Sequence, residues 1–298
     1  MIFKTVSNKF RQNKIYTPSK IIDVNVIRNH INDTFISKLT GKNPSTDMLV
    51  YSSQNPYGGF TRNTNCWLNG VSNISCFSPA QLSGANWFQR GGTLISPRHI
   101  LLAKHFTINI LPGGTPILFV DDSNNVITRN LIAYELDSTD IAIGLLDKDI
   151  PSNIKFAKVL PKNYKTYLTM VDNFLSAPDS AEKLYCVGLD QQEKAIVKRF
   201  IGIQNYVGVE NIPNAIVSNL HPEDTFASFT ETVIVGDSGN PFFLIIDNEL
   251  ILLSTWWTDI SGPFISTRYD KVNYMMSKLG GGYNLTPIDL EYVYNKYK

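Results

Sequence analysis

The sequence predicts an all-β protein with a helix after the β body. From residue 87 onward, short apolar runs alternate with turn-forming residues, a pattern typical of a sandwich or barrel. Between residues 269 and 279, apolar and aromatic side chains recur at helical spacing, and three glycines follow at 280–282. At roughly 150 residues per domain, 298 residues fit two domains or one large all-β unit.

Composition and charge exclude several classes of protein. The chain is 43% hydrophobic and 18% charged, which rules out a disordered or low-complexity protein. With 27 Lys and Arg against 26 Asp and Glu, the net charge is +1. So small a charge predicts no nucleic-acid partner and no anionic membrane surface. No apolar run approaches the ~20 residues that span a bilayer, and we identify no signal peptide.

The cysteine content indicates a reducing compartment. The three residues, Cys66, Cys76 and Cys186, are too few and too irregularly spaced for a disulfide framework or a zinc site. Cys66 and Cys76 are the nearest pair for a single bridge. Three reduced, mostly buried thiols are the preferred interpretation.

The first part of the chain differs from the rest. Residues 1–80 are polar and weakly patterned, and we interpret them as an extension packed on, or preceding, the main domain. Within them, apolar side chains at 26, 27, 31 and 35 predict a helix between residues 21 and 39.

Seven apolar runs predict strands in the main domain. They cover residues 92–95, 100–103, 117–120, 141–146, 185–188, 242–246 and 250–253. Residues 96–99 form a predicted turn with Pro at its second position. Asp247 and Asn248 form a predicted hairpin turn. The Pro-containing segment 147–161 is a predicted crossing between two halves.

Residues 236–241 (GDSGNP) are the strongest chemical signal in the sequence. Glycines on either side of Ser238 allow a tight or left-handed backbone that can present the Ser238 hydroxyl group. Such a loop can also aim the N–H groups of Gly236 and Ser238 at one point, as an oxyanion hole requires. The simpler alternative is a turn before the strand at 242–246.

A nucleophilic serine needs a base, and four histidines are available. All of them precede Ser238, which excludes the Ser, acid, His order of α/β-hydrolases. We expect His30 in the N-terminal helix, His99 exposed or capping a turn, and His221 in a loop. No pair of histidines has a metal-site spacing. The order of the residues does not by itself choose among the four histidines.

Five segments in the correct order resemble the trypsin/chymotrypsin-like serine peptidases. Residues 91–105 (GGTLISPRHILLAKH) are similar to the strand pair that ends in the catalytic His of that family, with Lys104 in place of an Ala. The other four are 138–146 (STDIAIGLL), 236–241 with Asn240 in place of Gly, 254–257 (STWW) and 266–274 (STRYDKVNY). The resemblance covers roughly residues 85–280.

The resemblance implies a specific architecture. It predicts two packed antiparallel six-stranded β-barrels, with an N-terminal extension and a C-terminal helix. The peptidase domain would span 81–280, with barrels at about 85–150 and 160–267 and a closing helix at about 268–280. Residues 281–298 would form a tail.

The resemblance also implies catalytic roles. Ser238 would attack a peptide carbonyl, His105 would take its proton, and Asp140 would orient His105. The N–H groups of Gly236 and Ser238 would bind the oxyanion. Thr232, Ser254, Thr255 and Trp256 would bind substrate. A Trp at 256 or 257 in place of a family Gly favours a small apolar P1 side chain, such as Ala or Val.

Two departures concern disulfides and activation. Phe106 and Ile234 stand where secreted relatives carry Cys, which agrees with a reducing compartment. No cleavage signal precedes Gly91, so a freed N-terminus is not expected to pair with Asp237. Asp237 then needs another partner: a Lys, an Arg or a backbone N–H group.

The sequence therefore predicts a serine endopeptidase that needs no metal or organic cofactor and acts on a polypeptide substrate. The alternative is a peptidase-fold structural or binding module with weak, self-directed or no activity. Self-processing and an assembly partner stay open, and so do a cytoplasmic and a virion-associated location.

Overall fold

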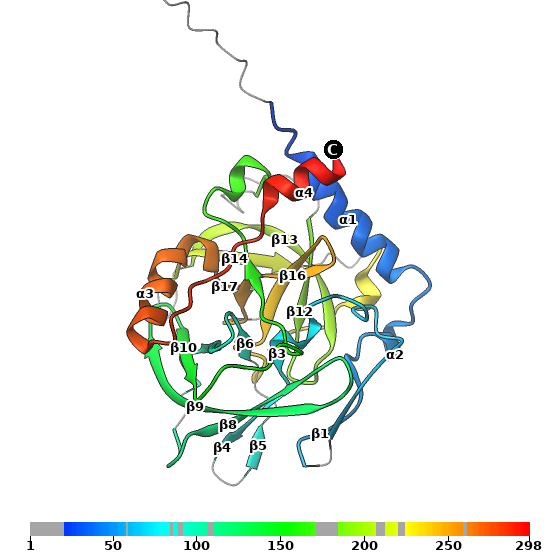
Figure 1. The fold of residues 1–298 in the computed structure, drawn as a ribbon. Helices are drawn as coiled ribbons and strands as arrows, with labels where there is room; N and C mark the ends of the chain where they lie inside the picture. Colours follow the sequence, from blue (N-terminus) through cyan, green and yellow to red (C-terminus); the bar gives the residue numbers. More distant parts are fainter. Residues whose placement is uncertain are drawn as a thin grey trace, which may run out of the picture.

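The structure, a computed structural model, describes residues 21–57, 59–83, 86–88, 92–106, 110–170, 184–206, 212–219, 224–258 and 261–298. The chain is mostly β, with few helices. A nearly closed, barrel-like sheet of seven strands lies beside a half-barrel of eight strands (Figure 1).

The half-barrel is antiparallel throughout. Its strand order is β3-β6-β7-β10-β9-β8-β4-β5. The strands are β3 (Phe77–Ser78), β4 (Ala80–Ser83), β5 (Asn86–Phe88), β6 (Gly92–Leu94), β7 (His99–Ala103), β8 (Thr115–Val120), β9 (Val126–Leu136) and β10 (Ile141–Leu146).

The barrel-like sheet has the order β11-β16-β15-β12-β13-β14-β17. Only its β11–β16 pair is parallel among the described strands. Every residue of β12 and β15 is buried, which explains why those strands are continuous apolar runs. The strands are β11 (Lys158–Val159), β12 (Leu184–Leu189), β13 (Ala195–Tyr206), β14 (Ile212–Asn219), β15 (Pro241–Ile246), β16 (Glu249–Thr255) and β17 (Ser261–Pro263).

The prediction of two six-stranded barrels is wrong in its strand numbers. The first predicted range, 85–150, holds six strands, but β3 and β4 from the preceding segment extend that sheet to eight. The second range, 160–267, also holds six, and β11 from the crossing segment makes seven. β3 and β11 have only two residues each, too few to show the alternation that identifies a strand in a sequence.

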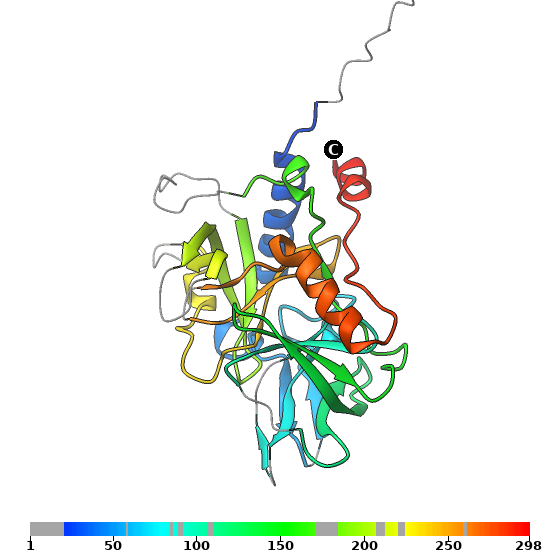
Figure 2. The same ribbon diagram turned by 90° about the vertical axis from the view of Figure 1, so that its left-hand side faces the viewer.

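Two of the longer helices cover the sheets. α1 (Asn25–Leu39) buries Ile27, Ile31 and Phe35, spaced by four, against β12 and β15. α3 (Tyr269–Leu279) packs on β9 and β10 and ends at Gly280, as the sequence predicts (Figure 2). The remaining helices are α2 (Pro44–Asp47), α4 (Leu290–Tyr297), η1 (Ile74–Cys76), η2 (Tyr164–Thr166), η4 (Ala227–Phe229) and η5 (Ile265–Arg268).

The segment before residue 81 is packed on both sheets. Its small hairpin pairs β1 (Tyr51–Asn55) with β2 (Gly59–Arg62). Trp67 is buried and its indole N–H donates to the carbonyl of Ala195 at 2.9 Å, which ties the segment to β13.

Several sequence predictions about local structure are confirmed. All seven predicted apolar runs lie in strands or extend them by one residue. Asp247 and Asn248 join β15 to β16 with φ of 52° and 61°, the left-handed pair of a tight hairpin. Cys66, Cys76 and Cys186 are free and buried. Burial raises the pKa of the Cys66 thiol to about 11, which disfavours the reactive thiolate.

Of the two expectations for His99, exposed or capping a turn, exposure is wrong, whereas hydrogen bonds that close the 96–99 turn are present. His99 begins β7 and is fully buried, because Gly281 and the ring of Tyr283 from the segment after α3 pack over it. Its Nδ1 lies 2.8 Å from the hydroxyl oxygen of Ser96, which also accepts the His99 backbone N–H.

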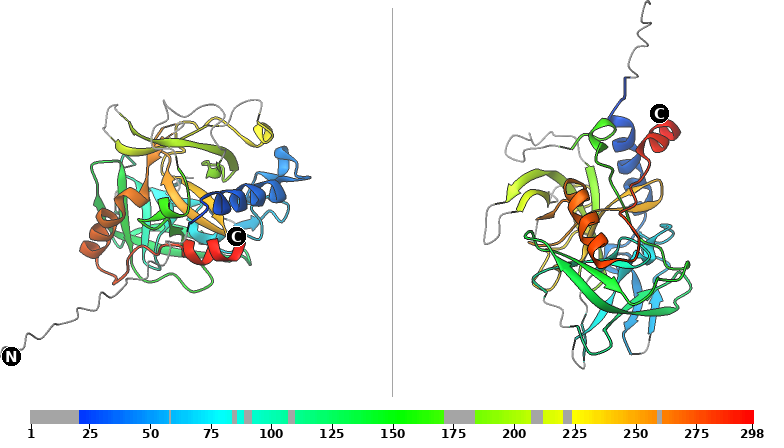
Figure 3. Two further views of the ribbon diagram at one scale, coloured as in Figure 1. Left: turned by 90° about the horizontal axis from the view of Figure 1, so that it is seen from above. Right: turned by 60° about the vertical axis from the view of Figure 1, so that its left-hand side comes forward.

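The tip of the β15–β16 hairpin joins two helices that are far apart in the sequence. The Asp247 carboxylate accepts from Lys296 and from the Tyr297 hydroxyl, at 2.6 and 2.7 Å. The Asp247 backbone N–H donates to His30 Nε2, whose ring stacks on Tyr297 with centroids 3.7 Å apart. Figure 3 shows α1 and α4 side by side at this place.

Candidate active site

His105 and Asp140 are brought together by the pairing of β7 with β10. Ala103 lies opposite Ile141 in this antiparallel pair. His105 follows β7 by two residues and Asp140 immediately precedes β10, so the two residues lie at the same end of the pair. The Lys104 N–H donates to the carbonyl of Asp140 at 3.0 Å and continues the pairing.

The Asp140 carboxylate holds His105 at two points. One oxygen lies 2.7 Å from His105 Nδ1, and the other accepts the His105 backbone N–H at 2.8 Å. The Asp140 side chain is 2% exposed, whereas that of His105 is 41% exposed. A buried carboxylate favours the proton on Nδ1, which leaves the Nε2 lone pair free to accept a proton.

The backbone of Asp140 is in an uncommon conformation. Its φ is 63°, a left-handed value that Asp tolerates better than most residues. Such backbone strain is concentrated at functional sites, where the surrounding structure holds it in place.

The nucleophile loop, residues 234–240, leads into β15 of the other sheet. Gly236 and Gly239 have φ of 108° and 85°, conformations in which any other residue would be strained. The N–H groups of Asp237, Gly239 and Asn240 are engaged, by the carbonyls of Ile234, Trp256 and Asp237 respectively.

Three N–H groups of the nucleophile loop, those of Val235, Gly236 and Ser238, make no hydrogen bond to any residue that the structure describes. Those of Gly236 and Ser238 are the two donors that the sequence singles out for an oxyanion hole. The Ser238 side chain is half-buried, and no hydrogen bond joins it to His105 in the described part of the chain.

The Asp237 carboxylate links the nucleophile loop to the turn that precedes β13. Its side chain is buried, and its two oxygens accept the backbone N–H groups of Gln191 and Ile234, at 2.9 and 2.7 Å. Of the three partners that the sequence left open, backbone N–H groups are the ones present. Gln191 carries no sequence signal for this role, because only tertiary packing brings it to Asp237.

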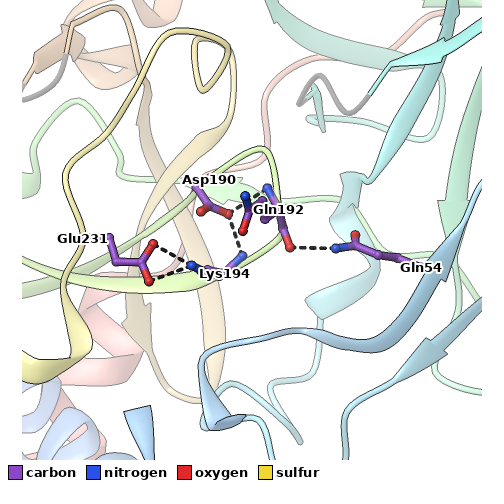
Figure 4. A network of polar contacts seen from close by, with 5 residues as sticks. All are labelled: Gln54, Asp190, Gln192, Lys194 and Glu231. Carbon is purple, nitrogen blue, oxygen red and sulfur yellow. Dashed lines mark hydrogen bonds and ion pairs between the residues drawn. The ribbon is translucent and has the colours of Figure 1, made fainter. Parts of the chain in front are cut away.

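Gln191 belongs to the support turn, residues 190–194 between β12 and β13. Figure 4 shows Asp190, Gln192 and Lys194 of this turn together with Gln54 and Glu231. One Asp190 carboxylate oxygen accepts the backbone N–H groups of Gln192 and Lys194, each at 2.8 Å. Lys194 forms an ion pair with Glu231 at 2.7 Å. Gln54, on β1, donates to the carbonyl of Gln192 at 3.0 Å. The support turn is thus held by Glu231, which precedes the nucleophile loop, and by Gln54 of the N-terminal segment.

Burial of Asp190 makes stability depend on pH. Burial raises its pKa from 3.8 to about 6, and the neighbouring Asp237 carboxylate adds to the rise, while the Lys194 N–H bond and charge oppose it. Because the pKa of Asp190 is higher in the folded than in the unfolded protein, the folded protein binds its proton more tightly. This binding contributes to the unfolding free energy in full below the unfolded-state pKa, and the contribution is lost as pH rises through the folded-state pKa. The rise corresponds to about 3 kcal/mol at about 1.36 kcal/mol per pKa unit.

We therefore expect Asp190 to contribute a decrease in the unfolding free energy between about pH 4 and pH 7, and Asp190→Asn to remove that contribution. Urea unfolding of both proteins across this pH range measures the difference. Burial is the main cause of the raised pKa of Glu193 and is the same in both proteins, whereas the smaller contribution of the Asp190 charge is lost together with Asp190 itself. Identical pH profiles would show that Asp190 does not titrate in this way.

The four predicted substrate-binding residues fall into two groups. Thr232 is exposed on the loop before Ser238. Ser254, Thr255 and Trp256 are buried beneath the nucleophile loop. The Trp256 indole N–H donates to the carbonyl of Leu189 at 2.8 Å. Their contact with substrate stays a prediction.

The space beside these buried residues is very small. It is too narrow to hold a water molecule, although the buried Ser218 hydroxyl on its wall has no hydrogen-bond partner in the described structure. Its walls come from Ile216, Ser218, Phe242, Ser254, Thr255, Trp256, Ser261 and Gly262.

A larger pocket of about 230 Å³ opens beside His105. Its lining is mostly apolar and comes from Leu102, Lys104, His105, Phe106, Tyr134, Leu136 and Ala142. Leu136, which is 48% exposed, forms part of the apolar lining of this pocket. Sequence reasoning missed this pocket. The alternation of Tyr134 and Leu136 on one strand face was the available signal.

Comparison with known proteins adds no family. No protein-family model matches the chain, and no curated protein matches it.

The described part of the chain offers no metal site. Among its residues, no group of three or more His, Cys, Asp or Glu side chains is placed to hold a metal ion. No helix in the described ranges has the length and apolar character needed to cross a membrane. His221 lies outside the described residues.

Proposed function

We propose that the chain is a serine endopeptidase of the trypsin/chymotrypsin-like kind. The observation that carries the proposal is the buried Asp140 carboxylate, bonded to both Nδ1 and the backbone N–H of His105. This contact supports a histidine held in one tautomer with Nε2 ready to act as a base. The barrel-like sheet and the half-barrel are compatible with the double-barrel fold of that family.

The proposed reaction follows from the roles of three side chains and two N–H groups. Ser238 Oγ attacks the peptide carbonyl carbon while its proton passes to His105 Nε2. The carbonyl oxygen becomes an oxyanion and accepts from the N–H groups of Gly236 and Ser238. His105 then protonates the leaving amine, and water releases the acyl group from Ser238. Asp140 stabilises the imidazolium throughout.

Two features support a substrate preference. The closed space at Ser254, Thr255 and Trp256 argues against a large side chain at the cleaved bond, and even Ala or Val would enter only if its walls move apart when substrate binds. The 230 Å³ pocket beside His105 suits a larger apolar side chain at a neighbouring position. A peptide-library profile with Arg, Lys or Asp before the cleaved bond would contradict the first part.

A biotin-tagged fluorophosphonate probe tests the proposed function. Attack by Ser238 Oγ on phosphorus forms an O–P bond, expels fluoride and transfers the serine proton to His105. We expect the wild type to gain one probe mass, Ser238→Ala to gain none, and the exposed-serine control Ser152→Ala to label like the wild type. A folded wild type that gains no mass would overturn the proposal.

One observation favours the second candidate, a binding or structural module on the same fold. No hydrogen bond joins Ser238 to His105 in the described structure. Catalytic hydrogen bonds are often long or poorly aligned in the absence of substrate, so a missing Ser238–His105 bond is also compatible with a peptidase. The probe separates the two candidates, and a module would shift the search to assembly partners and to self-cleavage.

A further inference from the structure

The orientation of one peptide bond decides whether the proposed oxyanion hole can form. The Val235 carbonyl and the Gly236 N–H belong to the same peptide unit. In a trans peptide these two groups point in opposite directions. Whatever fixes the Val235 oxygen therefore also fixes the direction of the Gly236 N–H.

Side-chain packing does not hold this peptide. Val235 is fully exposed and Ile234 is 57% exposed, so neither apolar side chain anchors the loop in the core. Gly236, with φ of 108°, has no side chain of its own. A glycine can rotate to other conformations with little steric penalty. The peptide thus depends on a polar contact for its orientation.

Gln191 supplies that contact. Its side-chain Nε2 donates to the Val235 carbonyl oxygen at 3.4 Å. Its amide group also lies against Gly236, where a Cβ atom would stand only 2.6 Å from Gln191 Oε1. The backbone N–H of Gln191 donates to Asp237 at 2.9 Å, so one residue holds the loop on both sides of Gly236.

The position of Gln191 is itself fixed. Asp190 accepts the N–H groups of Gln192 and Lys194, which closes the support turn around Gln191. Gln54 holds the same turn from the N-terminal segment. The Gln191 side chain is therefore presented by a turn with a defined shape rather than by a free loop.

We propose that Gln191 is a positioning residue that locks the Val235–Gly236 peptide with the Gly236 N–H facing the oxyanion. The proposal rests on the proposed peptidase function. Gln191 touches neither the substrate nor the reacting atoms in this proposal. It acts through the Val235 carbonyl, by excluding the orientation in which that oxygen would occupy the oxyanion hole.

The test compares Gln191→Met with Gln192→Met. Met keeps the length of Gln but cannot donate, and both variants keep the backbone contacts of the support turn. The Gln192 side chain is exposed and makes no hydrogen bond within the described structure, which makes it a matched control. The fluorophosphonate probe serves as the reagent, because its phosphoryl oxygen must enter the oxyanion hole.

Loss of a complete oxyanion donor lowers rates by about 10²- to 10³-fold, and a misoriented donor should have a smaller effect. We expect the maximal labelling rate of Gln191→Met to fall about tenfold, with the half-saturating probe concentration and the melting temperature unchanged. Gln192→Met should match the wild type.

Gln191→Glu gives an independent readout. A protonated Glu can donate to the Val235 oxygen, whereas a carboxylate repels it. The labelling rate of this variant relative to the wild type should therefore rise as pH falls. A structural defect independent of protonation would lower the ratio equally at every pH. Because Asp190 also titrates in this turn, the same rise in an Asp190→Asn background is required to assign it to residue 191.

The outcomes separate the lock from the proposed function. If the wild type is labelled and Gln191→Met is labelled equally fast, the proposed positioning role of Gln191 is overturned and the peptidase proposal is unaffected. Equal losses in Gln191→Met and Gln192→Met also overturn it. A folded wild type that does not label at all removes the proposed function and the lock together.

Discussion

Asp140→Asn is expected to lower the rate of labelling by the fluorophosphonate probe by about 10⁴-fold, the loss typical of this substitution in a Ser-His-Asp triad. The amide oxygen of Asn can still accept the His105 backbone N–H, so the loop keeps its shape. The amide NH₂ then faces His105 Nδ1 and donates to it. This places the imidazole proton on Nε2, where it prevents His105 from accepting the Ser238 proton.

Asn suits this position because it tolerates the left-handed φ of 63° about as well as Asp. Melting temperature and circular dichroism should therefore show a folded variant. Asp122→Asn, which changes an exposed carboxylate, is the matched control and should keep the wild-type rate. An Asp140→Asn protein that labels within tenfold of the wild type would refute the role of Asp140.

Asp237→Asn is expected to lower the unfolding free energy by about 1 to 3 kcal/mol, the penalty for an unsatisfied buried polar group. Asp237 uses both oxygens as acceptors, for the N–H groups of Gln191 and Ile234. Asn offers one acceptor only, and its NH₂ group would face the second N–H group. Both groups are donors, and the 1% exposure of Asp237 leaves almost no access for water.

Urea unfolding measures the change, with Asp122→Asn again as the control. The same substitution should slow probe labelling, because the Ile234 contact shapes the loop that carries Gly236 and Ser238. A change in unfolding free energy below about 0.5 kcal/mol, the range of neutral surface substitutions, would mean that the two N–H groups do not depend on Asp237.

The sequence predicts elements well where burial is one-sided or complete. The apolar runs that become β7 and β10 are visible, and their pairing brings His105 to Asp140. The longer strands β9 and β13 were missed. The described burial of β9 is mostly intermediate or exposed, and Arg and Asn interrupt its apolar residues, so it forms no apolar run. Such strands are defined by their neighbours more than by their own composition.

The candidate site likewise contains some residues that the sequence identifies and others that it does not. Ser238, its flanking glycines and the order of the triad are local or ordered signals that a single sequence contains. Gln191 and the pocket beside His105 are not, because they arise where separate segments meet in space. α4 was likewise not predicted, since its eight residues fall in a range that was interpreted as a tail.

The contacts at the β15–β16 hairpin tip have a consequence for synthesis. His30 precedes its partner Asp247 by 217 residues. The contacts of these two residues with Lys296 and Tyr297 can form only after α4 has been made. At about 5 to 20 residues per second, a ribosome needs about 10 to 40 s to make the chain between His30 and Asp247. The apolar face of α1 therefore emerges well before β12, and then β15, can cover it, and it is accessible to chaperones during that interval.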